Sequence, residues 1–220
     1  MPYIIGTFIF TIMSGVLCGA IWFTPPAKVL GETARVIYFH VPVAWISALA
    51  FSMSLWQSVQ YLRTNNPEHD IRAEVSARLG LWFCVLATIT GAVFAKAAWN
   101  MYWNWDPREV SITILLLVYM AYFGLRSAVS DPETRMRLAA VYDILASFAM
   151  PFLFFVVPRI YSSLHPDTVI NSRGSNKILD HRMLLVFFAA LIGFTLTYFW
   201  IYVLSIRVER LVRAREESDE

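Results

Sequence analysis

The fold is decided by an uncharged run near the C-terminus, MLLVFFAALIGFTLTYFWIYVLSI, from Met183 to Ile206. An α-helix of this length covers the roughly 30 Å of hydrocarbon in a bilayer. Backbone polar groups in lipid must be hydrogen-bonded within their own segment, and the run lacks the period of two that marks a barrel strand. The run therefore predicts a transmembrane helix.

Five further stretches of the chain are almost free of charge: Tyr3 to Phe23, Val36 to Leu62, Leu79 to Ala95, Val110 to Leu125 and Leu138 to Val157. The first is not followed by a small-x-small cleavage site, so we count it as a retained span. No repeat or linker divides the chain. The sequence predicts an all-α integral membrane protein, a bundle of six transmembrane helices. Its membrane domain covers residues 1–206 and a charged cytoplasmic tail covers 207–220.

The composition agrees with a membrane protein and argues against other classes. Hydrophobic residues make up 58% of the 220 residues, against 18 basic and 16 acidic side chains, which is too apolar for an ordinary soluble domain. A net charge of +2 gives no basis for nucleic-acid binding. Cys18 and Cys84 both lie in apolar runs, so we expect packing residues rather than a disulfide, a metal cluster or a covalent haem attachment site.

The distribution of basic residues predicts the orientation. Six spans put both termini on one side, where loops 63–78 and 126–137 and the tail carry ten Lys and Arg in 42 residues. The loops on the other side carry eight in 51. The positive-inside rule therefore favours cytoplasmic termini. We expect the tail beyond Ile206 to be a helix end followed by a disordered terminus.

Unusual residues gather in the loops of the outer side. His40 stands at the start of the second span, and His165 lies in the fifth loop. The third loop is rich in tryptophan and holds four large aromatic residues within seven positions: Trp99, Tyr102, Trp103 and Trp105. Two imidazoles beside a cluster of aromatic side chains predict a site for a flat ligand that contains iron. Haem fits, because neutral imidazole is a common axial ligand of its iron.

Each of these signals has an ordinary alternative. A single His at a membrane interface is more often a polar cap than a ligand, and Trp and Tyr are enriched at both interfaces because their rings are amphipathic. An anchoring belt does not require four aromatic residues in one loop, however. His181, just before the sixth span, is either an interfacial residue or a substitute ligand, whereas His69 falls on the other side.

The stretch Asp106-Pro107-Arg108-Glu109 predicts the start of the fourth helix. Asp is a favoured N-cap, Pro suits the first helical position, and an acid three residues after the cap completes a capping box. Asp106 would then serve the site by fixing its geometry. Arg108 has no such structural duty and is a candidate partner for a haem propionate, along with Arg35 and Lys96.

Two residues inside the spans also stand out. Pro151 is deep in the fifth span and predicts a bend there. Asp143 is the only formal charge in the six runs. It lies near the cytoplasmic end, where it could reach water or pair with Arg135 or Arg137; the alternative is a role in transport.

The stretch WNMYWNWDPR, from Trp99 to Arg108, resembles the tryptophan-rich signature of the cytochrome c assembly family. The neighbouring motifs His40-Val41-Pro42 and Leu164-His165 resemble those of the branch called CcmC, the haem exporter protein C. The six-span layout, with both His in the loops adjoining the tryptophan-rich loop, is similar to that branch across nearly the whole chain. Asn100 and Tyr102 depart from the usual Gly and Trp. Asp106 to Glu109 is also similar to the related haem-synthase branch, CcsA, which has more spans.

The resemblance implies a haem-handling protein of the bacterial inner membrane. It would hold haem b non-covalently at the periplasmic face, between the axial ligands His40 and His165, and present it to the haem chaperone CcmE. The signature residues would contact the haem: Trp99, Trp103, Trp105 and Asp106. The ABC transporter proteins CcmA and CcmB and the small membrane protein CcmD would be its partners.

We expect no enzyme activity, because no nucleophile or acid/base pair in the sequence identifies a catalyst. The alternatives are a CcsA-like haem-synthase component and a membrane electron-transfer subunit with haem b. The latter favours His pairs on facing helices at membrane depth, whereas these His lie in loops or at a helix end. A permease that uses Asp143 is a further alternative.

Overall fold

The computed structural model describes residues 2–27, 30–164 and 180–219. In these residues, six helical segments are long and apolar enough to cross a membrane. Their helices are α1 (Pro2–Cys18, continued by the π-helical turn Gly19–Phe23), α2 (Ile37–Thr64), α3 (Pro67–Trp99), α4 (Pro107–Ala128), α5 (Pro132–Pro151) and α7 (His181–Asp219). A 3₁₀ turn, Glu32–Val36, precedes α2, and the short α6 (Val157–Ile160) follows α5 after a π-helical turn, Phe152–Val156. The prediction of a six-helix membrane fold is confirmed.

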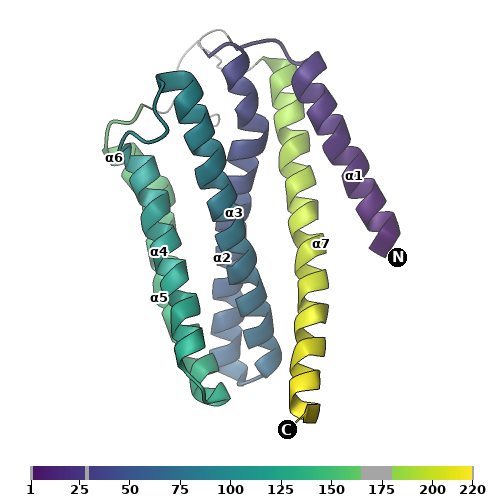
Figure 1. Ribbon diagram of the computed structural model, residues 1–220, viewed down its shortest axis with the longest axis vertical. Helices are drawn as coiled ribbons and strands as arrows, with labels where there is room; N and C mark the ends of the chain where they lie inside the picture. The colour runs from purple at the N-terminus through teal and green to yellow at the C-terminus, as the bar shows by residue number, and fades with distance from the viewer. Residues whose placement is uncertain (1, 28–29, 165–179, 220) are drawn as a thin grey trace.

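The helices stand side by side in three pairs (Figure 1). α2 and α3 form the central pair and pack most extensively against each other. α4 and α5 lie along one side of this pair, while α7 contacts both central helices on the other side and carries α1. We call the end with segments 19–36, 100–106 and 152–164 the loop end. The opposite end, with 65–66, 129–131 and 207–219, is the turn end.

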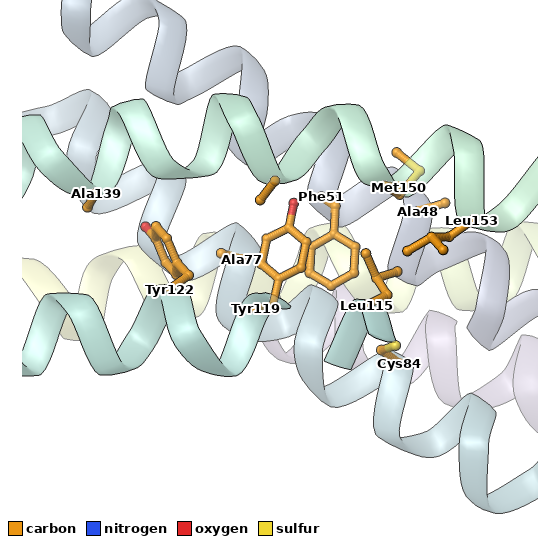
Figure 2. Packing of buried hydrophobic residues seen from close by; sticks show 11 residues of the cluster. Ala48, Phe51, Ala77, Cys84, Leu115, Tyr119, Tyr122, Ala139, Met150 and Leu153 are labelled. Carbon is orange, nitrogen blue, oxygen red and sulfur yellow. The ribbon is translucent and has the colours of Figure 1, made fainter. Parts of the chain in front are cut away.

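Small residues let the central helices approach closely. Ser76 Oγ donates to the Ala50 carbonyl oxygen at 2.7 Å. A Cβ on Gly80 would lie only 2.6 Å from Cε1 of Phe51, so the glycine makes room for that ring. Phe51 in turn stacks on Tyr119 of α4 with ring centroids 3.6 Å apart, which Figure 2 shows as two overlapping rings. This contact joins the α4–α5 pair to the central pair.

The turn end is more helical than predicted. Only Asn65 and Asn66 separate α2 from α3, although the sequence predicted a loop over residues 63–78. Asn66 caps α3 by accepting a hydrogen bond from the Glu68 backbone N–H at 3.0 Å, and Asp131 caps α5 in the same way through the Thr134 N–H at 2.8 Å. Hydrogen bonds from Thr134 also hold the pKa of Asp131 below its ordinary value.

A charge cluster joins three helices at the turn end. It consists of Asp70 and Glu74 of α3, Arg126 of α4 and Arg213 of α7. The buried Arg126 guanidinium donates to both Asp70 carboxylate oxygens, at 2.7 and 3.0 Å, and to Glu74 at 2.6 Å. Arg213 binds the same two acids, at 3.3 and 2.9 Å. Beyond Ile206 the predicted helix end is present, but the predicted disordered terminus was wrong, because α7 continues to Asp219 and Arg213 attaches it to α3.

The buried carboxylate of Asp143 has hydroxyl partners rather than the predicted arginines. Its Oδ2 accepts hydrogen bonds from Ser54 Oγ at 2.6 Å and Ser58 Oγ at 2.7 Å, which link α5 to α2. The expected pairing with Arg135 or Arg137 was wrong because the side chain points into the bundle, where it is fully buried. These bonds give Asp143 a structural role, because they join α5 to α2. Pro151, predicted to bend the fifth span, is where α5 ends and the π-helical turn begins.

Candidate functional site

The aromatic loop, residues 99–105, begins where α3 ends. Asn100 adopts the left-handed conformation, with φ of 61°, and its backbone N–H donates to the Lys96 carbonyl oxygen at 3.0 Å. Lys96 Nζ donates to the Asn100 backbone oxygen at 3.1 Å and to its Oδ1 at 2.8 Å. The same ammonium lies 5.5 Å from the ring centre of Tyr102. Lys96 thus closes the end of α3 and orders the first half of the loop.

The four predicted aromatic residues divide into two half-buried rings and two exposed ones. Trp99 packs edge to face against the buried Phe94 of α3, with centroids 5.3 Å apart. Trp103 packs edge to face against Trp105, with centroids 5.7 Å apart. Tyr102 is 62% exposed and Trp105 is 76% exposed. The loop therefore offers large aromatic surface at the rim of the bundle.

Trp105 has a backbone conformation that is rare for a bulky residue, with φ of 60°. Polar contacts on both sides hold it. The Asn104 N–H donates to Glu109 Oε2 at 2.9 Å, and the Asp106 N–H donates to Asn104 Oδ1 at 3.0 Å. Such a conformation costs about 1–3 kcal/mol and persists only where its surroundings fix it. These two hydrogen bonds fix it here.

Asp106 is the anchor of the loop end. It is buried and caps α4, accepting from the Arg108 N–H at 2.9 Å, and together with Glu109 it forms the predicted capping box. It also accepts from Ser163 Oγ, at 2.8 Å to Oδ2, and from the Leu164 N–H at 2.8 Å. One carboxylate therefore ties the aromatic loop to the segment after α6. Leu164 immediately precedes His165, which lies outside the described residues.

His40 lies in the first turn of α2, and its ring packs on α3. Nδ1 is 3.0 Å from Thr90 Oγ1. A Cβ on Gly91 would lie 3.0 Å from the ring atom Cε1, so a side chain at this position would displace the imidazole by a few tenths of an ångström. Thr90 is nine residues before Trp99, or roughly 14 Å along α3. The predicted ligand is therefore half-buried between two helices rather than on the rim.

The contacts of Thr90 define the tautomer of His40. The Thr90 hydroxyl donates its hydrogen to the Leu86 carbonyl oxygen at 2.8 Å, as helical threonines commonly do. It can then only accept from His40, so Nδ1 carries the proton and Nε2 keeps its lone pair. A hydrogen bond on one ring nitrogen that orients the other for a metal is the usual outer-shell arrangement of ligating histidines.

The three predicted propionate partners differ in their surroundings. Arg35 folds back on the turn after α1, where it contacts Ala20 and donates to Thr24 Oγ1 at 3.0 Å, and it pairs with Glu32. Lys96 is engaged with Asn100, as described above. Arg108 is partly buried in the first turn of α4, next to the anchor Asp106.

The structure brings together some of the predicted residues and adds others. It joins Asp106 to the segment before His165, and it pairs Trp103 with Trp105. His181 is the first residue of α7, and His69 contacts Gln57 at the turn end. Sequence reasoning missed three contributors: Thr90, Gly91 and Ser163. The capping pattern at Asp106 was readable in the sequence, but nothing in it links Thr90 to a histidine 50 positions away.

Fold and site together define a multi-pass helical membrane protein with an aromatic loop anchored at one end of the bundle. Comparison with known proteins narrows this class. The family model described as Heme exporter protein C matches residues 1–220. The chain therefore belongs to the heme exporter protein C (CcmC) family.

Relatives of the chain come from bacteria and from plant mitochondria. It is 33% identical to the heme exporter protein C of Bradyrhizobium diazoefficiens over 184 residues, which cover 83% of this chain and 69% of that protein. It is 28% identical to the heme exporter protein C of Rhodobacter capsulatus, over 98% of this chain and 87% of that protein. A putative ccmC-like mitochondrial protein of cytochrome c biosynthesis from Marchantia polymorpha is 28% identical, over 71% of this chain and 66% of that protein.

Proposed function

We propose that this protein acts in haem export for cytochrome c maturation, holding haem b non-covalently at the loop end and passing it to the haem chaperone CcmE. The names of its relatives support haem as the cargo. The observation that carries the proposal is the Asp106 anchor, which ties the aromatic loop to the segment leading to His165. A flat ligand bound at the loop end would have to contact the aromatic loop and the segment leading to His165 at the same time.

The axial ligands in this proposal are His40 and His165. His40 is prepared for the task because Thr90 occupies Nδ1 and leaves the Nε2 lone pair for iron. The aromatic residues cover the porphyrin face: Trp99, Tyr102, Trp103 and Trp105. Arg108 pairs with a propionate, since a guanidinium makes charge-assisted hydrogen bonds to carboxylates.

Delivery requires a site from which the cargo can leave. Tyr102 and Trp105 are exposed at the rim, so one edge of a bound ligand would remain within reach of a partner. His40, in contrast, is half-buried and would hold the iron from inside the bundle. A ligand held firmly on one side and openly on the other suits transfer better than permanent storage.

The protein in this proposal sits in the bacterial inner membrane, with the loop end at the periplasm and both termini in the cytoplasm. CcmA, CcmB and CcmD act beside it. Its own contribution is binding and transfer rather than bond chemistry, and any covalent attachment of haem takes place on the chaperone within the complex.

The test is the haem absorbance of the purified full-length protein. We expect His40→Ala and His165→Ala each to change the axial-ligand bands, and the double variant to lose them. His69→Ala is the matched control, because His69 contacts Gln57 at the turn end. An unchanged spectrum in the double variant, or an equal change in the control, would rule out this pair of ligands.

A further inference from the structure

A groove of about 400 Å³ opens at the turn end between α2, α3 and α7. Its volume falls in the range of about 300–1,000 Å³ that is usual for small-molecule sites. One wall of this groove is apolar and the other is basic. We call the whole groove the basic groove. Its lining includes Met53, Val203 and Ile206 on the apolar side and Arg72, Arg207 and Arg210 on the basic side.

The two walls follow the change from hydrocarbon to headgroup along α7. Val203 and Ile206 belong to the uncharged run that ends at Ile206. Arg207 is the next residue, and Arg210 is less than one turn further on. The groove therefore runs across the level at which a transmembrane helix leaves the hydrocarbon and basic side chains meet lipid headgroups.

The basic wall keeps an excess of positive charge. Arg72 pairs with Glu68 at 2.8 Å, and Arg210 pairs with the same carboxylate. Among the described residues, Arg207 forms no ion pair, and it is exposed. The next acid on α7, Glu209, binds Arg78 and Arg213 instead. Arg72 and Arg210 thus share one carboxylate while Arg207 adds an unneutralised charge, so the groove attracts an anion.

We infer that the basic groove binds an anionic phospholipid. Its phosphate diester lies at Arg207 and Arg210, and an acyl chain lies along Met53, Val203 and Ile206. A soluble anion has no use for the apolar wall. A zwitterionic lipid brings an ammonium group close to the arginines, which lowers its affinity. This inference is independent of the proposed haem function, because the residues that line the groove belong to the turn-end halves of α2, α3 and α7.

The test is native mass spectrometry of the full-length protein titrated with dioleoyl phosphatidylglycerol or dioleoyl phosphatidylcholine. We expect phosphatidylglycerol to bind more tightly. Arg207→Gln should weaken its binding about fivefold, since one basic residue contributes about 1 kcal/mol to attraction of anionic lipid. Arg63→Gln is the matched control, because Arg63 is an exposed arginine in the last turn of α2 that does not line the groove.

A second variant separates the groove from general charge effects. In Val203→Trp, the indole would occupy the groove beside its apolar wall, while every arginine stays in place. This variant should therefore reduce phosphatidylglycerol binding in the same assay. Equal binding of the two lipids, or an equal loss in Arg63→Gln, would overturn the inference. Displacement of the lipid by inorganic phosphate alone would also overturn it, because the groove would then be a plain anion site.

Discussion

Thr90 Oγ1 of α3 accepts a hydrogen bond from Nδ1 of His40 on α2, across 3.0 Å. The contact lies inside the central helix pair, where the backbones are held close by small residues. The orientation of the imidazole is therefore set by the packing of two transmembrane helices rather than by a loop. A ligand held in this way keeps its direction when the loops move.

Replacing Thr90 by Val removes the acceptor for His40 while keeping the shape of the side chain. We expect haem affinity to fall at least tenfold, which is typical when an outer-shell partner of a metal ligand is lost. Thr90→Ser keeps the hydroxyl and should restore binding. Titration of haem followed by its absorbance measures both variants.

Thr88→Val is the control for this pair, because Thr88 donates to the Cys84 carbonyl oxygen in the same helix. It should bind haem like the unaltered protein. If Thr88→Val lowers affinity as much as Thr90→Val, the effect belongs to helix α3 in general and not to the imidazole.

Gly91→Ala should separate stability from binding. Alanine favours a helix over glycine by about 1 kcal/mol, so the variant should unfold no more easily than the parent. Its Cβ would nevertheless meet His40 Cε1 at 3.0 Å and displace the ring by a few tenths of an ångström. We expect altered axial-ligand bands with an unfolding temperature no lower than that of the parent. Gly124→Ala, with open space around the new Cβ, should leave the bands unchanged.

Asp106→Ala should weaken both stability and haem binding. It removes the cap of α4 and the acceptor for Ser163 and Leu164, at a cost of roughly 2 kcal/mol in the free energy of unfolding. Asp131→Ala removes a comparable cap at the turn end. Thermal unfolding and haem titration should show a loss of binding for Asp106→Ala only. Retained haem affinity in that variant would contradict the role of Asp106 as the anchor.

Two substitutions of Trp105 separate the effect of its backbone conformation from the effect of its indole ring. Both Trp105→Gly and Trp105→Ala remove the indole and should lower haem affinity to a similar extent. The glycine variant should be more stable than the alanine variant by about 1 kcal/mol, because only glycine adopts a φ of 60° without a steric cost. Equal unfolding temperatures would mean that the loop abandons this conformation once the ring is gone.

The six spans were predictable because lipid excludes charge, and Asp143 is the only charge in the six runs. The positions at which the helices end could not be predicted in the same way. The interval 63–78 contains Glu68, Asp70 and Glu74, which look like a solvated loop in the sequence, yet they form helix because arginines from α4 and α7 neutralise them. Hydropathy does not detect partners that are more than 50 residues away.

In the candidate site, too, some features follow from local sequence and others depend on distant residues. The aromatic residues and the capping box at Asp106 follow from local sequence and could be identified there. The depth of His40 could not, because it depends on Thr90 and Gly91 in another helix. Tertiary packing determines which residues of another helix contact a histidine, and such contacts cannot be predicted from a single sequence.

The charge cluster also sets an order of events during synthesis. Asp70 and Glu74 leave the ribosome well before Arg126, which is 56 and 52 positions later, and Arg213 follows after 143 and 139 positions. Before α7 has been made, the two carboxylates have Arg126 as their shared partner, and Glu74 also pairs with Arg78 in its own helix. The guanidinium of Arg213 arrives only with α7, so the attachment of α7 to α3 forms after the contact between α4 and α3.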